Sequence, residues 1–295
     1  MTLDYKGLEA LYTIQEVQSF EGAAKKLHIT QSAISQRIKS LETFYGEPVL
    51  IRTFPYQPTE LGKRLIGHFK RISLLEDELN KEIGKSESLQ RIAIAINRDS
   101  LETWFIEWIR KTDLLGSILL EVIADDQERT IDYLKNGLVT AALSTAEKEI
   151  LGGKAQFVGN MEYVLTATPE FVKTHLSKEK NLLTAPALKF DLNDQLHEKY
   201  LEKFFGLNGK EINYHVVPSV QAFKQMALSG FAYGLIPRID IEKELKVKKL
   251  IEIYENKVWK VPLYWHYWAI ESKTYQKFNQ EIIRFISQKL GPAAS

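Results

Sequence analysis

The first ninety residues carry apolar side chains at helical spacing. They recur every three or four residues in three groups: Leu8, Leu11 and Tyr12, then Ala23, Ala24 and Leu27, then Ile34, Ile38, Leu41 and Tyr45. Residues at such steps lie on one side of a helix. The pattern therefore predicts three helices that pack against one another.

A longer helix is predicted over residues 59–83. Its apolar residues keep a nearly heptad rhythm, interrupted at His68, and comprise Leu61, Leu65, Ile72, Leu75 and Leu79. Such a stripe either packs within its own domain or pairs with a second helix, and few apolar residues nearby could cover it. We predict these five residues as a dimerisation surface. The Gly-Lys-Ser-Glu-Ser segment at 84–88 is predicted to be a hinge.

From Gln90 onward, short apolar runs alternate with helical patterns. A first series predicts strands at 92–96, 118–124 and 139–143, with helices at 100–111 and 127–135 between them. A second series predicts strands at 164–167, 188–190, 214–217 and 232–236, with helices from 169, at 193–205 and at 219–228. This alternation is typical of parallel sheets covered by helices on both faces. Two such series predict two α/β lobes.

Charge changes this picture little. The 295 residues include 39 Lys and Arg against 38 Asp and Glu, so the net charge of +1 does not by itself indicate a nucleic-acid partner. Residues 1–71 hold ten basic and seven acidic side chains, which is a small surplus. Any argument for DNA binding must therefore come from the positions of particular residues.

Several classes of protein are excluded or disfavoured by composition. The absence of cysteine excludes disulfides, thiolate nucleophiles, and cysteine-based zinc or iron–sulfur sites. No apolar run reaches the roughly 18 residues of a membrane helix, and the charged Asp4, Lys6 and Glu9 are unlike a signal peptide. We therefore expect a soluble, cytoplasmic protein.

Motifs for catalysis are missing. The chain has no Gly-x-Gly pair for a dinucleotide, no Gly-x-Ser-x-Gly elbow, and no two histidines three to five residues apart. Gly84-Lys85-Ser86 resembles the end of a phosphate loop, but Leu79 stands where its first glycine would be. We predict a protein that is not an enzyme and that needs no cofactor and no metal.

The segment 21–41, EGAAKKLHITQSAISQRIKSL, has the pattern of a helix-turn-helix. A first helix ends near Leu27, His28 and Ile29 form a turn, and the Thr30 hydroxyl is placed to cap a second helix that begins at Gln31. On that second helix, apolar residues face one side, while the opposite side and the exposed front end present Gln31, Ser32, Ser35, Gln36, Lys39 and Thr43. Such side chains can contact base edges in a major groove, but they are equally common on a solvated surface helix.

These residues resemble the amino-terminal domain of LysR-type transcriptional regulators. The resemblance rests on LHITQSAISQRIKSLETFYGEPVLIRT at 27–53 followed by PTELG at 58–62. It implies a winged helix-turn-helix in which Gln31, Ser32, Ser35 and Gln36 face DNA and Arg52 in the wing holds phosphate or the minor groove. Thr30, Arg37 and Lys39 are further candidate DNA contacts. One departure is the Phe-Pro-Tyr-Gln sequence at 54–57, where many members of the family carry a second arginine.

The resemblance also implies the domain organisation. Residues 1–58 would form the DNA-binding domain, 59–89 a linker and dimerisation helix with the hinge, and 90–295 an effector-binding domain of α/β class that resembles type 2 periplasmic binding proteins. Within it, lobe 1 would comprise about 90–162 and 268–295, and lobe 2 about 163–267. The expected partners are double-stranded DNA, RNA polymerase and a second copy of the chain, as a dimer or a tetramer.

Further segments resemble one subgroup of that family. NRDSLETW at 97–104, IPR at 236–238, IEKEL at 241–245 and LYWH at 263–266 are similar to the subgroup that contains ArgP and LysG, also labelled IciA. The resemblance implies a basic amino acid, lysine or arginine, as effector, and control of genes for transport or metabolism. Three alternatives stay open: an architectural DNA-binding protein or replication-initiation inhibitor without effector, a LysR-type regulator with a different effector, and a solute-binding protein without DNA.

Candidate effector residues follow from the predicted lobes. In open α/β sheets, ligands bind beyond the carboxyl ends of strands, where helix amino termini attract anions. At or near such places the chain offers Asn97, Asp99, Ser100, Trp104, Asp126, Glu128, Ser144, Asp191 and Ser219. Other roles are open for each, because serine is a good N-cap, aspartate is common at helix starts, and tryptophan fills cores.

Overall fold

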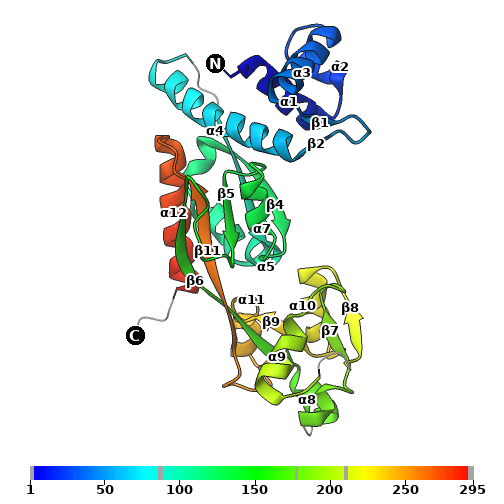
Figure 1. Ribbon diagram of the computed structural model, residues 1–295. Coiled ribbons are helices and arrows are strands. Elements are labelled where there is room, and N and C mark those ends of the chain that lie inside the picture. Colours follow the sequence, from blue (N-terminus) through cyan, green and yellow to red (C-terminus); the bar gives the residue numbers. More distant parts are fainter. Residues whose placement is uncertain (1–2, 86–88, 177–178, 209–211, 292–295) are drawn as a thin grey trace. The chain divides into compact units, whose positions relative to one another are not determined.

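The structure of the chain is a computed structural model that describes residues 3–85, 89–176, 179–208 and 212–291 (Figure 1). The first unit comprises Met1–Asn97, Thr112–Phe157 and Tyr264–Arg284, and the second comprises Arg98–Lys111, Val158–Leu263 and Phe285–Ser295. Residues 86–88 of the predicted hinge lie outside the described residues. No helix in the described part of the chain is both long and apolar enough to span a membrane.

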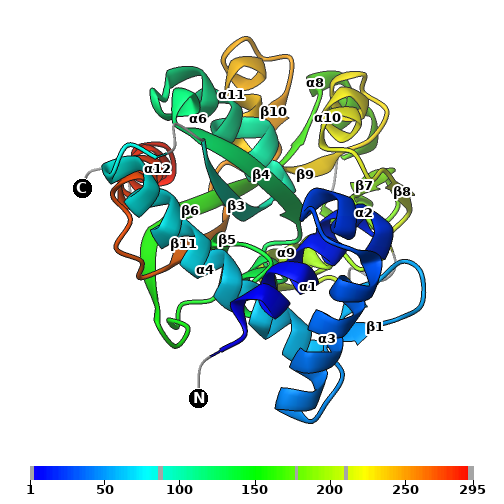
Figure 2. The same ribbon diagram turned by 90° about the horizontal axis from the view of Figure 1, so that it is seen from above.

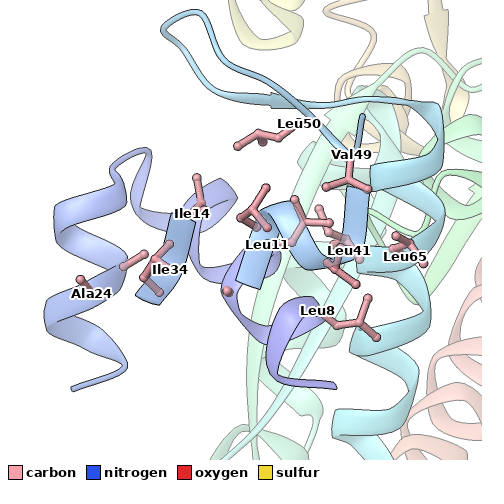
Figure 3. Close-up of a cluster of buried hydrophobic side chains, with 13 residues drawn as sticks. Leu8, Leu11, Ile14, Ala24, Ile34, Leu41, Val49, Leu50 and Leu65 are labelled. Carbon is pink, nitrogen blue, oxygen red and sulfur yellow. The ribbon is translucent and has the colours of Figure 1, made fainter. Parts of the chain in front are cut away.

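The three predicted amino-terminal helices form, as α1 (Tyr5–Val17), α2 (Phe20–Lys26) and α3 (Gln31–Tyr45). Their apolar faces meet in one core, in which Leu8, Leu11, Ile14, Ile34 and Ile38 are fully buried (Figure 3). Burying an aliphatic side chain of this size stabilises a fold by about 1.5–3 kcal/mol. The core therefore fixes the orientation of α3.

A polar side chain caps each of these helices. Asp4 accepts a hydrogen bond from the Gly7 backbone at 3.0 Å, and Ser19 accepts one from Gly22 at 3.0 Å. The predicted cap at Thr30 is confirmed, because its hydroxyl accepts from the Ala33 backbone at 3.2 Å. In the turn before it, His28 adopts a φ of 53°, a conformation that usually requires glycine.

A two-stranded hairpin and a long helix complete this part of the first unit. Strands β1 (Leu50–Ile51) and β2 (Gln57–Pro58) pair antiparallel and form the wing. Helix α4 (Glu60–Glu82) follows. The predicted dimerisation stripe divides along it: Leu65 is buried in the core of α1–α3, whereas Leu75 and Leu79 are 44% and 56% exposed. The first part of the stripe therefore packs within its own domain.

Helix α4 lies directly against a turn of the first unit, backbone to backbone. A Cβ added to Gly67 would stand 2.4 Å from the Gly137 Cα, and one added to Gly137, whose φ is +67°, would stand 2.1 Å from the Gly67 Cα. Beside this contact, the Lys70 ammonium donates to the Leu138 carbonyl at 2.5 Å, and burial lowers the pKa of Lys70. The Arg71 guanidinium lies 4.2 Å from the centre of the Trp268 ring.

The sheet of the first unit is built on β3 (Gln90–Asn97). It pairs parallel with β4 (Ile118–Asp125) and with β5 (Ala141–Ser144), and β5 pairs antiparallel with the end of β11 (Trp259–Trp268). Helix α7 (Thr130–Lys135) connects β4 to β5, and α12 (Lys273–Leu290) follows β11. The parallel pairing of β3 with β4 and β5, and the alternation of these strands with helices, agree with the pattern predicted from the sequence.

The second unit differs from the predicted parallel sheet. Strand β6 (Gly153–Ala167) pairs antiparallel with β9 (Gly234–Pro237) and β10 (Ile251–Glu252), while β7 (Ala187–Lys189) and β8 (Tyr214–Val216) form a parallel pair. Helices α8 (Pro169–His175), α9 (Leu196–Phe205), α10 (Val220–Leu228) and α11 (Arg238–Lys246) lie between the strands along the chain. The predicted parallel pairing is therefore present in β7 and β8 but wrong for β6, β9 and β10, because strand spacing does not encode strand direction.

The unit boundaries also differ from the predicted lobes. Residues 98–111 and 285–291, which the sequence places in predicted lobe 1, group by their contacts with the second unit, and the division into two lobes stays a prediction. Contacts within that unit explain this: the Lys289 ammonium pairs with Glu107 at 2.6 Å, and a Cβ on Gly159 would stand 2.0 Å from the Leu290 carbonyl oxygen. The end of α12 is thus attached to α6 (Ile106–Lys111) and to β6.

Substituting either glycine of the α4 contact should destabilise the first unit. In Gly67→Ala or Gly137→Ala the new methyl group meets backbone atoms that cannot rotate away. We expect losses of about 1–3 kcal/mol in the free energy of unfolding, measured by urea denaturation. Gly116→Ala is the matched control, because nothing lies within 4 Å of its added Cβ. Equal stability of all three variants would contradict the close approach.

The buried His197 should make the second unit sensitive to acid. It is 2% exposed, its Nδ1 lies 3.4 Å from the Leu188 carbonyl oxygen, and burial lowers its pKa from 6.5 to about 4. Between these two pH values the unfolded chain binds a proton that the folded chain does not, so stability falls as pH falls, by at most about 1.4 kcal/mol per pH unit. His197→Phe should flatten this slope in urea titrations at pH 7, 6 and 5. An unchanged slope would show that other groups cause it.

Candidate nucleic-acid interface and effector residues

The front of α3 is open to solvent. Gln31, Ser32, Ser35, Gln36 and Lys39 are exposed, whereas the apolar back of the helix is buried. The expected amphipathic arrangement is therefore present, and the amide and hydroxyl groups point away from the core. Whether they contact DNA is a separate prediction.

The amino terminus of α3 is suited to an anion. Its first turn contains no acidic residue, so the positive end of the helix dipole is not neutralised locally. The Thr30 and Ser32 hydroxyls are hydrogen-bonded to each other at 2.9 Å, and Thr30 also accepts from the Ala33 backbone as the helix cap. The Thr30 hydroxyl is therefore already engaged within the protein. Arg37 is half-buried, and its guanidinium lies 3.8 Å from the Glu9 carboxylate.

The carboxylate of Glu42, on α3, forms hydrogen bonds with the wing. Glu42 accepts a hydrogen bond from the Arg52 guanidinium at 2.8 Å and another from the Val49 backbone at 3.3 Å. The side chain of Arg52 is still 58% exposed. The predicted wing cation, Arg52, therefore lies at the surface, but the Glu42 carboxylate already neutralises part of its charge.

Three residues meet at the carboxyl ends of β3 and β5 in the first unit. The Asn97 amide donates to the Gln127 side-chain oxygen at 3.4 Å, and the Ser144 hydroxyl donates to the Gln127 carbonyl at 3.1 Å. Asn97 is 3% exposed, and its side-chain oxygen has no hydrogen-bond partner among the described residues. Gln127 was not predicted, although it stands between the predicted Asp126 and Glu128 in the sequence.

In the second unit, Asp99, Ser100 and Trp104 lie on one irregular helix. It begins as α5 (Arg98–Ser100), widens into a π-helical turn at Leu101–Phe105, and continues as α6. Asp99 accepts a hydrogen bond from the Tyr163 hydroxyl. Ser100 is fully buried, and its hydroxyl has no partner among the described residues. π-Helical turns occur often at functional sites.

The other predicted effector residues have local roles or face solvent. Asp191 accepts from the Asn193 and Asp194 backbones at 2.7 and 2.9 Å, and Ser219 caps α10 through the Ala222 backbone at 3.3 Å. Trp104 is 1% exposed and packs edge-on against Phe105, as a core residue does. Asp126 and Glu128 are exposed. The structure thus separates Asn97, Ser100 and Ser144, which are buried polar groups, from residues that close a loop or cap a helix.

The family resemblance is confirmed by comparison with known proteins. The model of the bacterial regulatory helix-turn-helix protein, lysR family, matches residues 5–63. The HTH-type transcriptional regulator ArgP of Vibrio cholerae is 38% identical over 293 residues, 98% of each chain, and ArgP of Aeromonas salmonicida is 39% identical over 286 residues, 95% of this chain and 96% of its own.

Solved structures agree. ArgP from Mycobacterium tuberculosis superposes with a TM-score of 0.87 at 32% identity, covering 97% of this chain and 98% of its own. Full-length LysG from Corynebacterium glutamicum, solved with bound effector Arg, superposes with a TM-score of 0.80 at 28% identity, covering 97% and 99%. These relatives are regulators and not enzymes. The chain therefore belongs to the LysR family of DNA-binding, helix-turn-helix transcriptional regulators.

Proposed function

We propose that this regulator reads DNA through the exposed front of α3 and responds to a basic amino acid, arginine or lysine. The observation that carries the first part is the exposure of Gln31, Ser32, Ser35 and Gln36 on a helix whose back is buried. Glutamine can form two hydrogen bonds to an adenine edge, and serine can pair with any base. As an intracellular DNA reader the protein would act in the cytoplasm, with RNA polymerase as a partner.

The effector proposal rests on a relative and on one buried acceptor. LysG, which is similar over nearly the whole chain, was solved with arginine bound. In the first unit, the Asn97 side-chain oxygen is buried without a partner among the described residues, and a buried polar atom in this state is costly unless a ligand satisfies it. An ammonium or guanidinium group carries the N–H donors that this oxygen lacks. Ser100, also without a partner in the described chain, is the corresponding candidate of the second unit.

We further propose that the chain self-associates through the second half of α4. Leu75 and Leu79 are exposed on a helix of 23 residues, and exposed leucines at near-heptad spacing favour pairing with another helix. Leu65 is excluded from this surface because it fills the core of α1–α3. Two-fold symmetry of the dimer would place two copies of α3 on spaced half-sites of DNA, and dimers could pair into a tetramer.

Substitutions in α3 and in the wing should have different effects on DNA binding. Gln36→Ala should relax the preference at one base pair by about 1–3 kcal/mol, because a bidentate contact is lost. Arg52→Ala should weaken binding to all sequences alike and lower the slope of log affinity against log salt by about one. Gel shifts over a series of salt concentrations measure both. If the two variants lose affinity evenly on every sequence, α3 is not the reading helix.

Arginine or lysine should raise the melting temperature of the purified full chain. A ligand at about one hundred times its Kd stabilises by about 2.7 kcal/mol, which corresponds to several degrees. Asn97→Leu should abolish this shift, whereas Ser219→Ala should retain it, since the Ser219 hydroxyl is already engaged as the cap of α10. The screen should include all twenty amino acids. If none shifts the melting temperature at millimolar concentration, the protein is a DNA-binding protein without an amino-acid effector.

A further inference from the structure

The wing ends in an exposed aromatic ring. Phe54 lies in the hairpin loop between β1 and β2, and it is 80% exposed, whereas the other phenylalanines among the exposed apolar residues range from 42% to 51%. Both ribbon views show this loop projecting from the helices (Figures 1 and 2). Residues 48–59 contain no acidic side chain and one basic side chain, Arg52. Nothing on the wing itself therefore repels a phosphate backbone.

The ring does not stand alone. Phe54 meets Tyr56 edge to face at 6.4 Å between ring centres, and Tyr56 meets Phe20 in the same way at 5.3 Å. The Tyr56 carbonyl also accepts a hydrogen bond from the Gln18 side chain at 3.0 Å, which ties the hairpin to the end of α1. A ring supported in this way loses little conformational freedom when it binds, so its apolar surface contributes more fully to affinity.

The wing and α3 are joined by hydrogen bonds. The Glu42 carboxylate joins α3 to Arg52 and to Val49 at the base of the hairpin, and the Thr59 hydroxyl donates to the Pro48 carbonyl at 2.8 Å. A duplex that accepts the front of α3 in its major groove presents its adjacent minor groove beside that helix. The hairpin, which is held to α3 through Val49 and Arg52, therefore lies beside the surface proposed to read DNA.

We infer that Phe54 enters the minor groove and wedges at a base step beside the sequence read by α3, a proposal that rests on DNA binding through α3. Apolar side chains inserted from the minor groove partly unstack a step and kink the duplex. The cost of unstacking depends on sequence and is lowest at pyrimidine–purine steps. Phe54 would thus add specificity without a hydrogen bond to any base, by selecting a deformable step at a fixed distance from the α3 contacts.

The test is selection from a pool of random double-stranded DNA with the full-length protein and its variants. The wild type should enrich TA or CA/TG steps at one position flanking the core of each half-site. Phe54→Ala should lose that enrichment, keep the core, and bind the best site about tenfold more weakly, the scale of one aromatic–base stacking contact. Its salt slope should not change, because no phosphate contact is removed.

Two variants serve as controls. Phe44→Ala removes another exposed aromatic ring of the same domain, 47% exposed in the last turn of α3 and outside the hairpin loop, and should leave the flanking preference intact. Phe54→Leu keeps an apolar wedge and should retain most of the step preference. The melting temperature of Phe54→Ala should equal that of the wild type, because the ring is largely in solvent.

A fluorescent base reports the wedge directly. 2-Aminopurine placed at the selected step should brighten when the wild type binds, since unstacking relieves its quenching, and should stay dim with Phe54→Ala. The proposal is overturned if Phe54→Ala selects the same flanking steps as the wild type, or if its affinity loss disappears at high salt. If Phe54→Ala has no effect while Gln36→Ala still relaxes the core, only this proposal fails; if neither changes selection, DNA reading by α3 fails as well.

Discussion

The contact between Gly67 and Gly137 is the constraint on which the first unit depends. At these two positions the backbone of α4 touches the turn that follows α7, and a Cβ on either glycine would collide with main-chain atoms. The neighbouring Lys70 and Arg71 then reach Leu138 and Trp268. Helices α1–α3 and α4 are thereby attached to the sheet that carries Asn97 and Ser144 within one unit.

The local features of the DNA-binding domain could be predicted from the sequence because they depend on near neighbours. The apolar back of α3, the cap at Thr30 and the turn at His28 each follow from a few consecutive residues. The glycine contact could not be predicted, since its two residues are seventy positions apart and neither belongs to a motif. For the same reason, the neighbours of Leu65 in the sequence do not show that its side chain is buried in the core of α1–α3.

The strand pairing and the candidate effector residues are harder to predict from the sequence, because both depend on residues far apart along the chain. Strand β6 has polar and exposed residues in its first half, so only its buried end, 164–167, had a recognisable strand pattern, and its antiparallel partners were missed. Serine at the start of a helix has the same sequence context whether it caps that helix, as Ser219 does, or lies buried without a partner in the described chain, as Ser100 does. Burial distinguishes them, and burial depends on the whole fold.

The ion pair between Arg52 and Glu42 has a consequence for how tightly the wing can hold DNA. The Glu42 carboxylate pairs with the Arg52 guanidinium as a DNA phosphate would. A phosphate that approached Arg52 would therefore have to compete with Glu42. In the proposed complex with DNA, Arg52 would therefore contribute less to affinity than an arginine without a carboxylate partner, and discrimination between sequences would depend on the groups that meet the bases.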